Sequence, residues 1–251
     1  MFRKKAASAF LVCALLICVG ALIITDVSTA QTKKKKKKKS SISIAPPSNF
    51  HPTTSGDPGT VKYYFFPNDT GTYWKFRTIQ IVLDQQGKLL RADTVYSESR
   101  VIANDRFSLQ RLPLMVTSDT SYRVGGEGVR SESVFYVDDS VAMTVFNNSV
   151  VGQGNSIFLV APVKKTNAWH EKQDDTTITA VAGFVDSVVT PLGRFDSVLV
   201  TITQQEFSDM RKYYAPGHGI IKTVFRSVGP SGRGLVIVTM EMLEFKKPGS
   251  N

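Results

Sequence analysis

Cysteine is nearly absent from this 251-residue chain. Its two cysteines, Cys13 and Cys18, both lie in an apolar run near the N-terminus, so the sequence beyond that run contains none. A disulfide framework, a CxxC redox pair and a cysteine-ligated zinc site are therefore excluded from the region that follows. A lipid-modified cysteine needs a small residue before it, whereas Val12 and Ile17 precede these two.

Catalytic motifs are also missing. The sequence has no GxSxG elbow, P-loop, HExxH helix or dinucleotide-binding fingerprint. It has three histidines. We expect His218, between two glycines, to have an exposed ring, and acidic residues that suit Ca²⁺ follow His170. A metal-dependent hydrolase that uses His170 or His218 is the weakest hypothesis, and we expect no cofactor, no metal and no catalytic residue.

Positive charge is concentrated at the N-terminus. The formal net charge is +10, but ten of the 31 basic residues precede Ser40. From Ser40 onward, 21 basic residues face 20 acidic ones, which leaves a net charge of +1. Nucleic-acid-binding proteins carry their basic face on the folded domain, so we do not expect nucleic acid as a partner.

Residues 1–30 are typical of a secretory signal peptide. A basic region at 3–5 precedes the apolar stretch 6–24, and Ser28 and Ala30 suit cleavage before Gln31. The apolar stretch is also long enough to span a bilayer, and the lysines that follow it oppose translocation. We therefore expect an exported protein, periplasmic, outer-surface or secreted, with an uncut inner-membrane anchor as the alternative.

Residues 31–59 are predicted to form a disordered linker. Consecutive lysines repel one another and extend the chain, and the stretch that follows is rich in Ser, Pro and Gly. The lysines would also attract an anionic envelope surface, by ~1 kcal/mol for each residue near charged lipid. The surface-electrostatic residues are Lys33, Lys34, Lys35, Lys36, Lys37, Lys38 and Lys39.

The pattern of β-strands begins at residue 60. We expect a strand at 60–66, and clear period-two alternation occurs at 74–84, 195–205 and 234–245. QQG at 85–87 suits a hairpin connection. Because helical periodicity is scarce, we predict an all-β protein with a curved antiparallel sheet or half-barrel and little helix.

A weak internal sequence similarity suggests two related β units. GTYWKF at 71–76 and TNAWHEK at 166–172 each place a tryptophan after a turn, at the start of a series of strands. We place the first unit at 60–150 and the second at 151–251, with the possibility that both pack as one body.

The second unit carries two motifs, TPLGRFDSVLV at 190–200 and YYAPGHGIIK at 213–222. Together with the turn before Trp169, they resemble the TapB-like family of bacterial secreted and envelope β proteins over residues 158–245. Thr166-Asn167 departs from the usual Gly-Asn, and His218 stands at a position that is more often apolar. The matching residues are Pro191, Gly193 and Phe195 in the middle motif, and Tyr214, Ala215, Pro216, Gly217, Gly219 and Lys222 in the last.

This resemblance implies a curved antiparallel sheet similar to the half-barrels of bacterial lipoprotein carriers, and it brings no known activity with it. The residues themselves indicate turns. Pro191 and Gly193 suit a tight turn, and Pro216 and Gly217 suit the two central positions of a type II turn. Gly219 gives a further flexible position before the next strand.

We interpret the chain as a non-enzymatic envelope protein that binds an apolar ligand, such as a lipid, or a partner protein. The alternative is a structural or adhesive module that holds partners through its strand edges and touches anionic surface through its lysine run. The candidate ligand-binding residues are Trp74, Trp169, Tyr214, Met240 and Met242.

Overall fold

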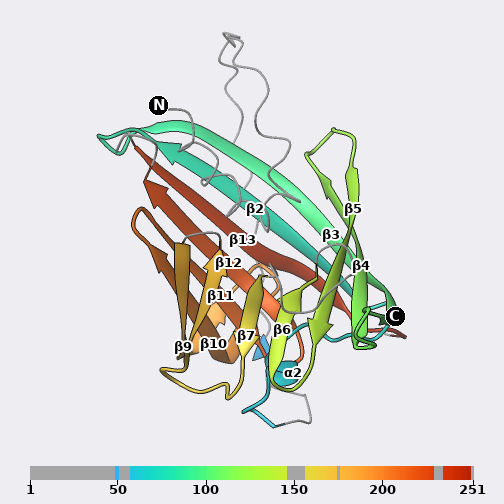
Figure 1. Ribbon diagram of the computed structural model, residues 1–251. Coiled ribbons are helices and arrows are strands. Elements are labelled where there is room, and N and C mark those ends of the chain that lie inside the picture. The colour runs from blue at the N-terminus through green and yellow to red at the C-terminus, as the bar shows by residue number, and fades with distance from the viewer. Residues whose placement is uncertain (1–48, 51–56, 146–155, 174–175, 229–233, 250–251) are drawn as a thin grey trace, which may run out of the picture. The chain divides into compact units, whose positions relative to one another are not determined.

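Hydrogen-bonded strands form a single curved sheet in the part of the chain that the structure describes (Figure 1). The structure is a computed structural model, and it describes residues 49–50, 57–145, 156–173, 176–228 and 234–249. The described strands belong to one compact unit that begins at Ser48. The prediction of an all-β chain with a curved antiparallel sheet is confirmed, since the described residues contain one helix, α2, of four residues.

Two series of six strands make up the sheet. The first series is β2 (Tyr73–Leu83), β3 (Leu89–Phe107), β4 (Pro113–Tyr122), β5 (Val129–Val137), β6 (Val141–Thr144) and β7 (Ile157–Val160). The second series is β8 (Ala168–Gln173), β9 (Thr176–Val189), β10 (Arg194–Gln205), β11 (Ser208–Ala215), β12 (Gly219–Val228) and β13 (Leu235–Lys246). Within each series, every strand pairs antiparallel with its neighbours in the chain.

The two series meet where β2 pairs with β13, the first strand of one series and the last of the other. The sheet order is therefore β7-β6-β5-β4-β3-β2-β13-β12-β11-β10-β9-β8. The short strand β1 (Asn49–Phe50) adds to β10 in parallel, off this path. That the two series are related units remains a prediction.

The hairpin turns follow the predicted chemistry. Gly87 has φ of +78° and donates its N–H to the Asp84 carbonyl at 3.1 Å, so QQG connects β2 to β3 as expected. Thr190 and Gly193 exchange two backbone hydrogen bonds, of 2.8 and 3.1 Å, around Pro191. A two-residue turn that begins with proline suits this connection between β9 and β10.

The turn between β11 and β12 is the predicted type II turn. The His218 N–H donates to the Ala215 carbonyl at 3.1 Å. Gly217, at the third position of the turn, has φ of +68°, which this turn type requires and glycine adopts without strain. The YYAPGHGIIK motif, which carries part of the family resemblance, therefore forms a β-hairpin, as the sequence indicated.

The concave face of the sheet is identified by contacts between strands that are far apart in the sheet order. Lys212 on β11 places its ammonium nitrogen 4.6 Å from the ring centroid of Phe158 on β7. Phe65, which follows α2, contacts Phe135 on β5 and Phe158 at centroid distances of 6.0 and 5.6 Å. Side chains that meet across the sheet in this way must share its inner side.

One end of the sheet, which we call the closed end, is filled by α2 (Val61–Tyr64). Backbone bonds tie this segment to three separate loops: Val61 N–H to the Asp139 carbonyl, Val163 N–H to the Gly59 carbonyl, and Gly217 N–H to the Tyr63 carbonyl. Asn167 also donates its side-chain amide to the Val160 carbonyl, which joins the end of β7 to the start of β8. The opposite end, with the hairpin tips at 84–88 and 206–207, is the open end.

The prediction of a strand at 60–66 is therefore wrong, because α2 forms within this range. Val61 and Phe65 are fully buried, and a buried backbone must form its hydrogen bonds within the protein. One helical turn does this locally, since the Phe65 N–H bonds to the Val61 carbonyl at 2.9 Å. The β propensity of VKYYFF is overridden by burial at the closed end.

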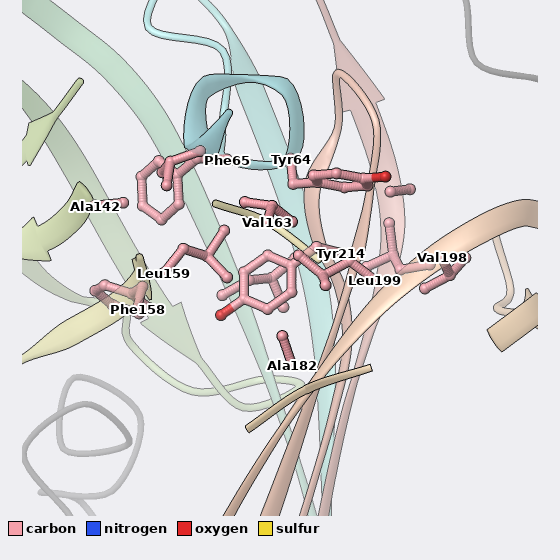
Figure 2. Close-up of a cluster of buried hydrophobic side chains, with 14 of the residues drawn as sticks. Tyr64, Phe65, Ala142, Phe158, Leu159, Val163, Ala182, Val198, Leu199 and Tyr214 are labelled. Atoms are coloured by element: carbon pink, nitrogen blue, oxygen red, sulfur yellow. The ribbon is translucent and has the colours of Figure 1, made fainter. Parts of the chain in front are cut away.

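The hydrophobic core gathers beneath the closed end (Figure 2). Tyr64 enters it from α2 and Phe65 from the position that follows α2, while Phe158 and Leu159 enter from β7 and Tyr214 from β11. Phe66 stacks edge-to-face on Trp74 at 4.7 Å between ring centroids. Burying side chains of this size stabilises the fold by ~1.5–3 kcal/mol each, so this end of the sheet carries most of the packing.

Gly219 marks a close approach within this core. It has φ of +81°, and a Cβ added to it would overlap the Phe66 ring. We expect Gly219→Ala to cost about 3 kcal/mol or more of unfolding free energy, because strain and overpacking add. Gly87→Ala is the matched control, with φ of +78° and no atom near the added Cβ, and should cost about 1 kcal/mol. Urea denaturation measures both, and equal losses would contradict the close packing.

Thr166 stands in the loop between β7 and β8, where the resembling family has glycine. Its φ of +67° is strained for a β-branched residue. Relief of this strain exceeds the entropic cost of glycine, so Thr166→Gly should raise the unfolding free energy by about 0.5–1 kcal/mol. Lys165→Gly, at the neighbouring position without positive φ, should lower it. A loss of stability in Thr166→Gly, read from the urea midpoint, would refute the strain.

Candidate functional site

The residues predicted to bind a ligand are brought together by the fold, but in the core. Trp74, Trp169, Tyr214 and Met242 are 2, 8, 0 and 0 % exposed, and Met240 packs against them partly buried. All five belong to one hydrophobic cluster. The structure therefore assigns them to packing at the closed end, with Met240 at its margin.

His218 is buried, so the expectation of an exposed ring is wrong. Its ring lies against Phe195 and Phe245 at centroid distances of 5.2 and 4.6 Å. Its Nδ1 lies 2.9 Å from the Pro216 carbonyl, which can only accept, so Nδ1 carries the proton. Burial lowers the pKa of the imidazole below its usual 6.5, although the bond to Pro216 opposes this. Trp74 Nε1 donates to the His218 carbonyl at 3.1 Å, which fixes the turn against β2.

His170 lies on β8, exposed, with Nδ1 3.0 Å from the Thr179 hydroxyl on β9. In the sheet order, β9, β10 and β11 separate it from the turn that holds His218. Asp174 and Asp175, two of the acidic residues that follow His170, lie outside the described residues. Among the residues that the structure describes, no three His, Cys, Asp or Glu side chains are grouped to hold a metal.

Beyond the closed core, the first row of paired residues on the concave face is rich in hydroxyl groups. We call it the hydroxyl row: Thr201, Lys212, Thr223, Met240 and Thr78, paired in that order from β10 through β11, β12 and β13 to β2. Directly paired residues of an antiparallel sheet project to the same face. The three threonines are 3, 7 and 4 % exposed, so this row is buried except near its lysine and methionine.

The next row toward the open end is apolar at its centre. Met210 on β11 pairs with Phe225 on β12, which pairs with Val238 on β13. We call these three residues the apolar row. All three are half-buried, and Val236 continues the same face one pair further along β13. The concave side of β11–β13 thus presents apolar side chains that the fold leaves partly uncovered.

The concave side of β3–β5 is polar instead. Ser97 and Ser121 face each other across β3 and β4 and are nearly buried. Asp119 accepts hydrogen bonds from Ser133 Oγ at 2.6 Å and Thr117 Oγ1 at 3.2 Å. One side of the concave face can therefore contact hydrocarbon while the other offers hydroxyl groups.

The convex face holds ion pairs instead. Glu241 on β13 accepts from Lys222 Nζ at 2.9 Å and from Arg77 at 3.0 Å. Burial would raise the pKa of Glu241, but these two bonds outweigh it and lower the pKa. On the same face, Glu98 lies 2.9 Å from Lys75 Nζ. Charges on neighbouring strands thus neutralise one another on the outside of the sheet.

Sequence reasoning missed the apolar row and Lys212. The signal was present in SDMRKYYA at 208–215, where alternate residues place Met210, Lys212 and Tyr214 on one face. Charged residues between them hide the alternation. The partners of β11 on either side decide which face is concave, and pairing is not visible in the segment itself.

Comparison with known proteins gives structural neighbours only. No protein-family model and no curated protein sequence matches this chain. A presumed lipoprotein from Parabacteroides distasonis is similar with a TM-score of 0.41 and 16 % identity, covering 73 % of this chain and 99 % of that one. A presumed exported protein with a YmcC-like fold from Bacteroides fragilis gives 0.42 and 15 %, covering 74 and 100 %.

The predicted signal peptide and the lysine run at 33–39 lie outside the described residues. In the ranges that the structure does describe, no helix combines the length and hydropathy of a membrane span.

Buried hydroxyl groups, the Lys212 ammonium group and the half-buried apolar row lie together on the concave face. They form the candidate site of the described region.

The buried His218 makes stability depend on pH. Because its pKa is lowered in the folded state, the unfolded state takes up the proton first, and stability present above about pH 6.5 is lost as the pH falls. Between about pH 7 and 5.5, we expect the unfolding free energy of wild type to fall by up to about 1.4 kcal/mol per pH unit more than that of His218→Phe. Urea denaturation at both pH values measures the difference.

The same comparison with His218→Gln, which keeps a side-chain amide donor for the Pro216 carbonyl, separates the titration from the lost hydrogen bond. Both variants should show the weaker pH dependence. A pH dependence as steep in the variants as in wild type would contradict a neutral, buried imidazole.

Proposed function

We propose that this protein is an exported, non-enzymatic binding protein of the bacterial envelope that holds an apolar ligand on its concave face. The apolar row of Met210, Phe225 and Val238 carries the proposal, because these side chains lie half-buried on the inner side of a curved sheet. Each Å² of apolar surface that a ligand covers there contributes about 25 cal/mol.

The filled closed end favours entry of the ligand from the open end. Trp74, Phe65 and Tyr214 already occupy the space beneath α2 at 2 % exposure or less. A ligand would therefore lie on the core formed at the hydroxyl row and extend toward the hairpin tips. Met240, the predicted contact at the margin of the core, is placed to touch it.

A non-enzymatic role agrees with the burial of His218, the best catalytic candidate in the sequence. His218 is buried between two phenylalanine rings, and its proton-bearing nitrogen bonds to a backbone carbonyl. General acid–base chemistry needs a ring nitrogen within reach of a substrate. Export and relation to the TapB-like family are part of the proposal, and both rest on sequence: the leader at 1–30 and the two hairpin motifs.

A pair of neighbouring substitutions tests the site. Phe225→Gln changes the concave face, whereas Val224→Gln changes the convex face one residue away on the same strand. With dodecanol as an uncharged apolar ligand, Phe225→Gln should weaken binding about tenfold, because lost apolar contact and a desolvated amide cost about 1.4 kcal/mol. Val224→Gln should bind like wild type.

Displacement of an apolar fluorescent dye from the purified protein measures the affinities, and urea denaturation confirms that both variants are folded. Equal affinities of Phe225→Gln and wild type would exclude the apolar row as the site. The structural or adhesive alternative depends on the strand edges and on Lys33–Lys39, and the lysines lie outside the described residues.

A further inference from the structure

We propose that the ligand carries an anionic head, a carboxylate or a phosphate, that binds to Lys212 in the hydroxyl row. This inference rests on the function proposed above and specifies its ligand class: an acyl chain with a negatively charged end. The apolar row would contact the chain, and the hydroxyl row, one pair nearer to the closed core, would contact the head.

The sheet register places Lys212 between two buried hydroxyl groups. It pairs with Thr201 on β10 and with Thr223 on β12, so all three side chains project from the same face. The Lys212 ammonium nitrogen reaches across the concave face to within 4.6 Å of the Phe158 ring centroid on β7. It therefore lies above the core, at the boundary between the filled closed end and the partly uncovered apolar row.

A second observation points to a polar ligand group at this level. The Thr78 hydroxyl, two strands beyond Thr223 in the same row, is buried and has no hydrogen-bond partner. The residue is 4 % exposed. A buried hydroxyl group without a partner is unfavourable, and a polar atom of a bound ligand would satisfy it. The hydroxyl of Tyr214, two residues from Lys212 on the same face, is also buried and interacts with the Thr201 side chain.

The chemistry of this row suits an anion. An ammonium and neighbouring hydroxyl groups donate charge-assisted hydrogen bonds to carboxylate or phosphate oxygens, and the bonds strengthen away from water.

The test compares a charged and an uncharged ligand of equal chain length. Lys212→Met keeps the length of the side chain and removes its charge. Arg211→Met is the matched control, one residue away on the convex face, where the arginine pairs with Asp209. Titration calorimetry of the folded full chain would use dodecanoate, dodecyl phosphate and dodecanol.

We expect Lys212→Met to weaken dodecanoate or dodecyl phosphate at least about tenfold while dodecanol binds as to wild type. Arg211→Met should leave all affinities unchanged, and Lys212→Arg should retain most of the anion affinity. The stronger of the two anions identifies the head as carboxylate or phosphate.

The outcomes separate this inference from the proposed function. If wild type and Lys212→Met bind the anions equally and dodecanol binds as well, the apolar site stands and the anionic head is refuted. An equal loss of dodecanol affinity in Lys212→Met would also overturn the inference, because the lysine would then act through packing. If none of the three ligands binds to wild type, both proposals fail.

Discussion

The packing of the α2 segment into the closed end of the sheet is the constraint on which the rest of the structure depends. Phe65 and Phe66 bring β5, β7 and Trp74 of β2 against one buried segment, and Gly219 leaves room for the Phe66 ring. Backbone bonds from the same segment hold loops that are far apart in the chain. The segment thus joins distant strands of the sheet in one buried core.

The closed end also determines where a ligand can lie. Large buried side chains occupy it, and the partly uncovered apolar surface begins beyond the hydroxyl row. Glu241 and its two basic partners lie on the convex side, and Lys212 projects to the concave side. Among the described residues, the inner surface therefore places a half-buried apolar row beside the Lys212 ammonium group, the combination that the proposed amphipathic ligand would require.

Local chemistry accounts for the parts of the fold that were predicted. The alternation in 74–84, 195–205 and 234–245 became β2, β10 and β13, because period-two patterns describe a single strand without reference to its partners. Gly87 and Gly217 adopt the positive φ that their turns require. The two failures, a strand at 60–66 and an exposed His218, both concern residues whose burial depends on distant segments.

The sequence by itself determined that the chain is all-β, where its hairpins turn and which residues alternate, since these features depend on neighbours within a few positions. Only the tertiary structure decided that β2 pairs with β13, that the closed end is filled by a helical turn, and which face of β11 is concave. These choices depend on contacts between residues far apart in the sequence, such as Trp74 and His218. Burial and hydrogen-bond satisfaction select among locally equivalent strands, and both are properties of the assembled sheet.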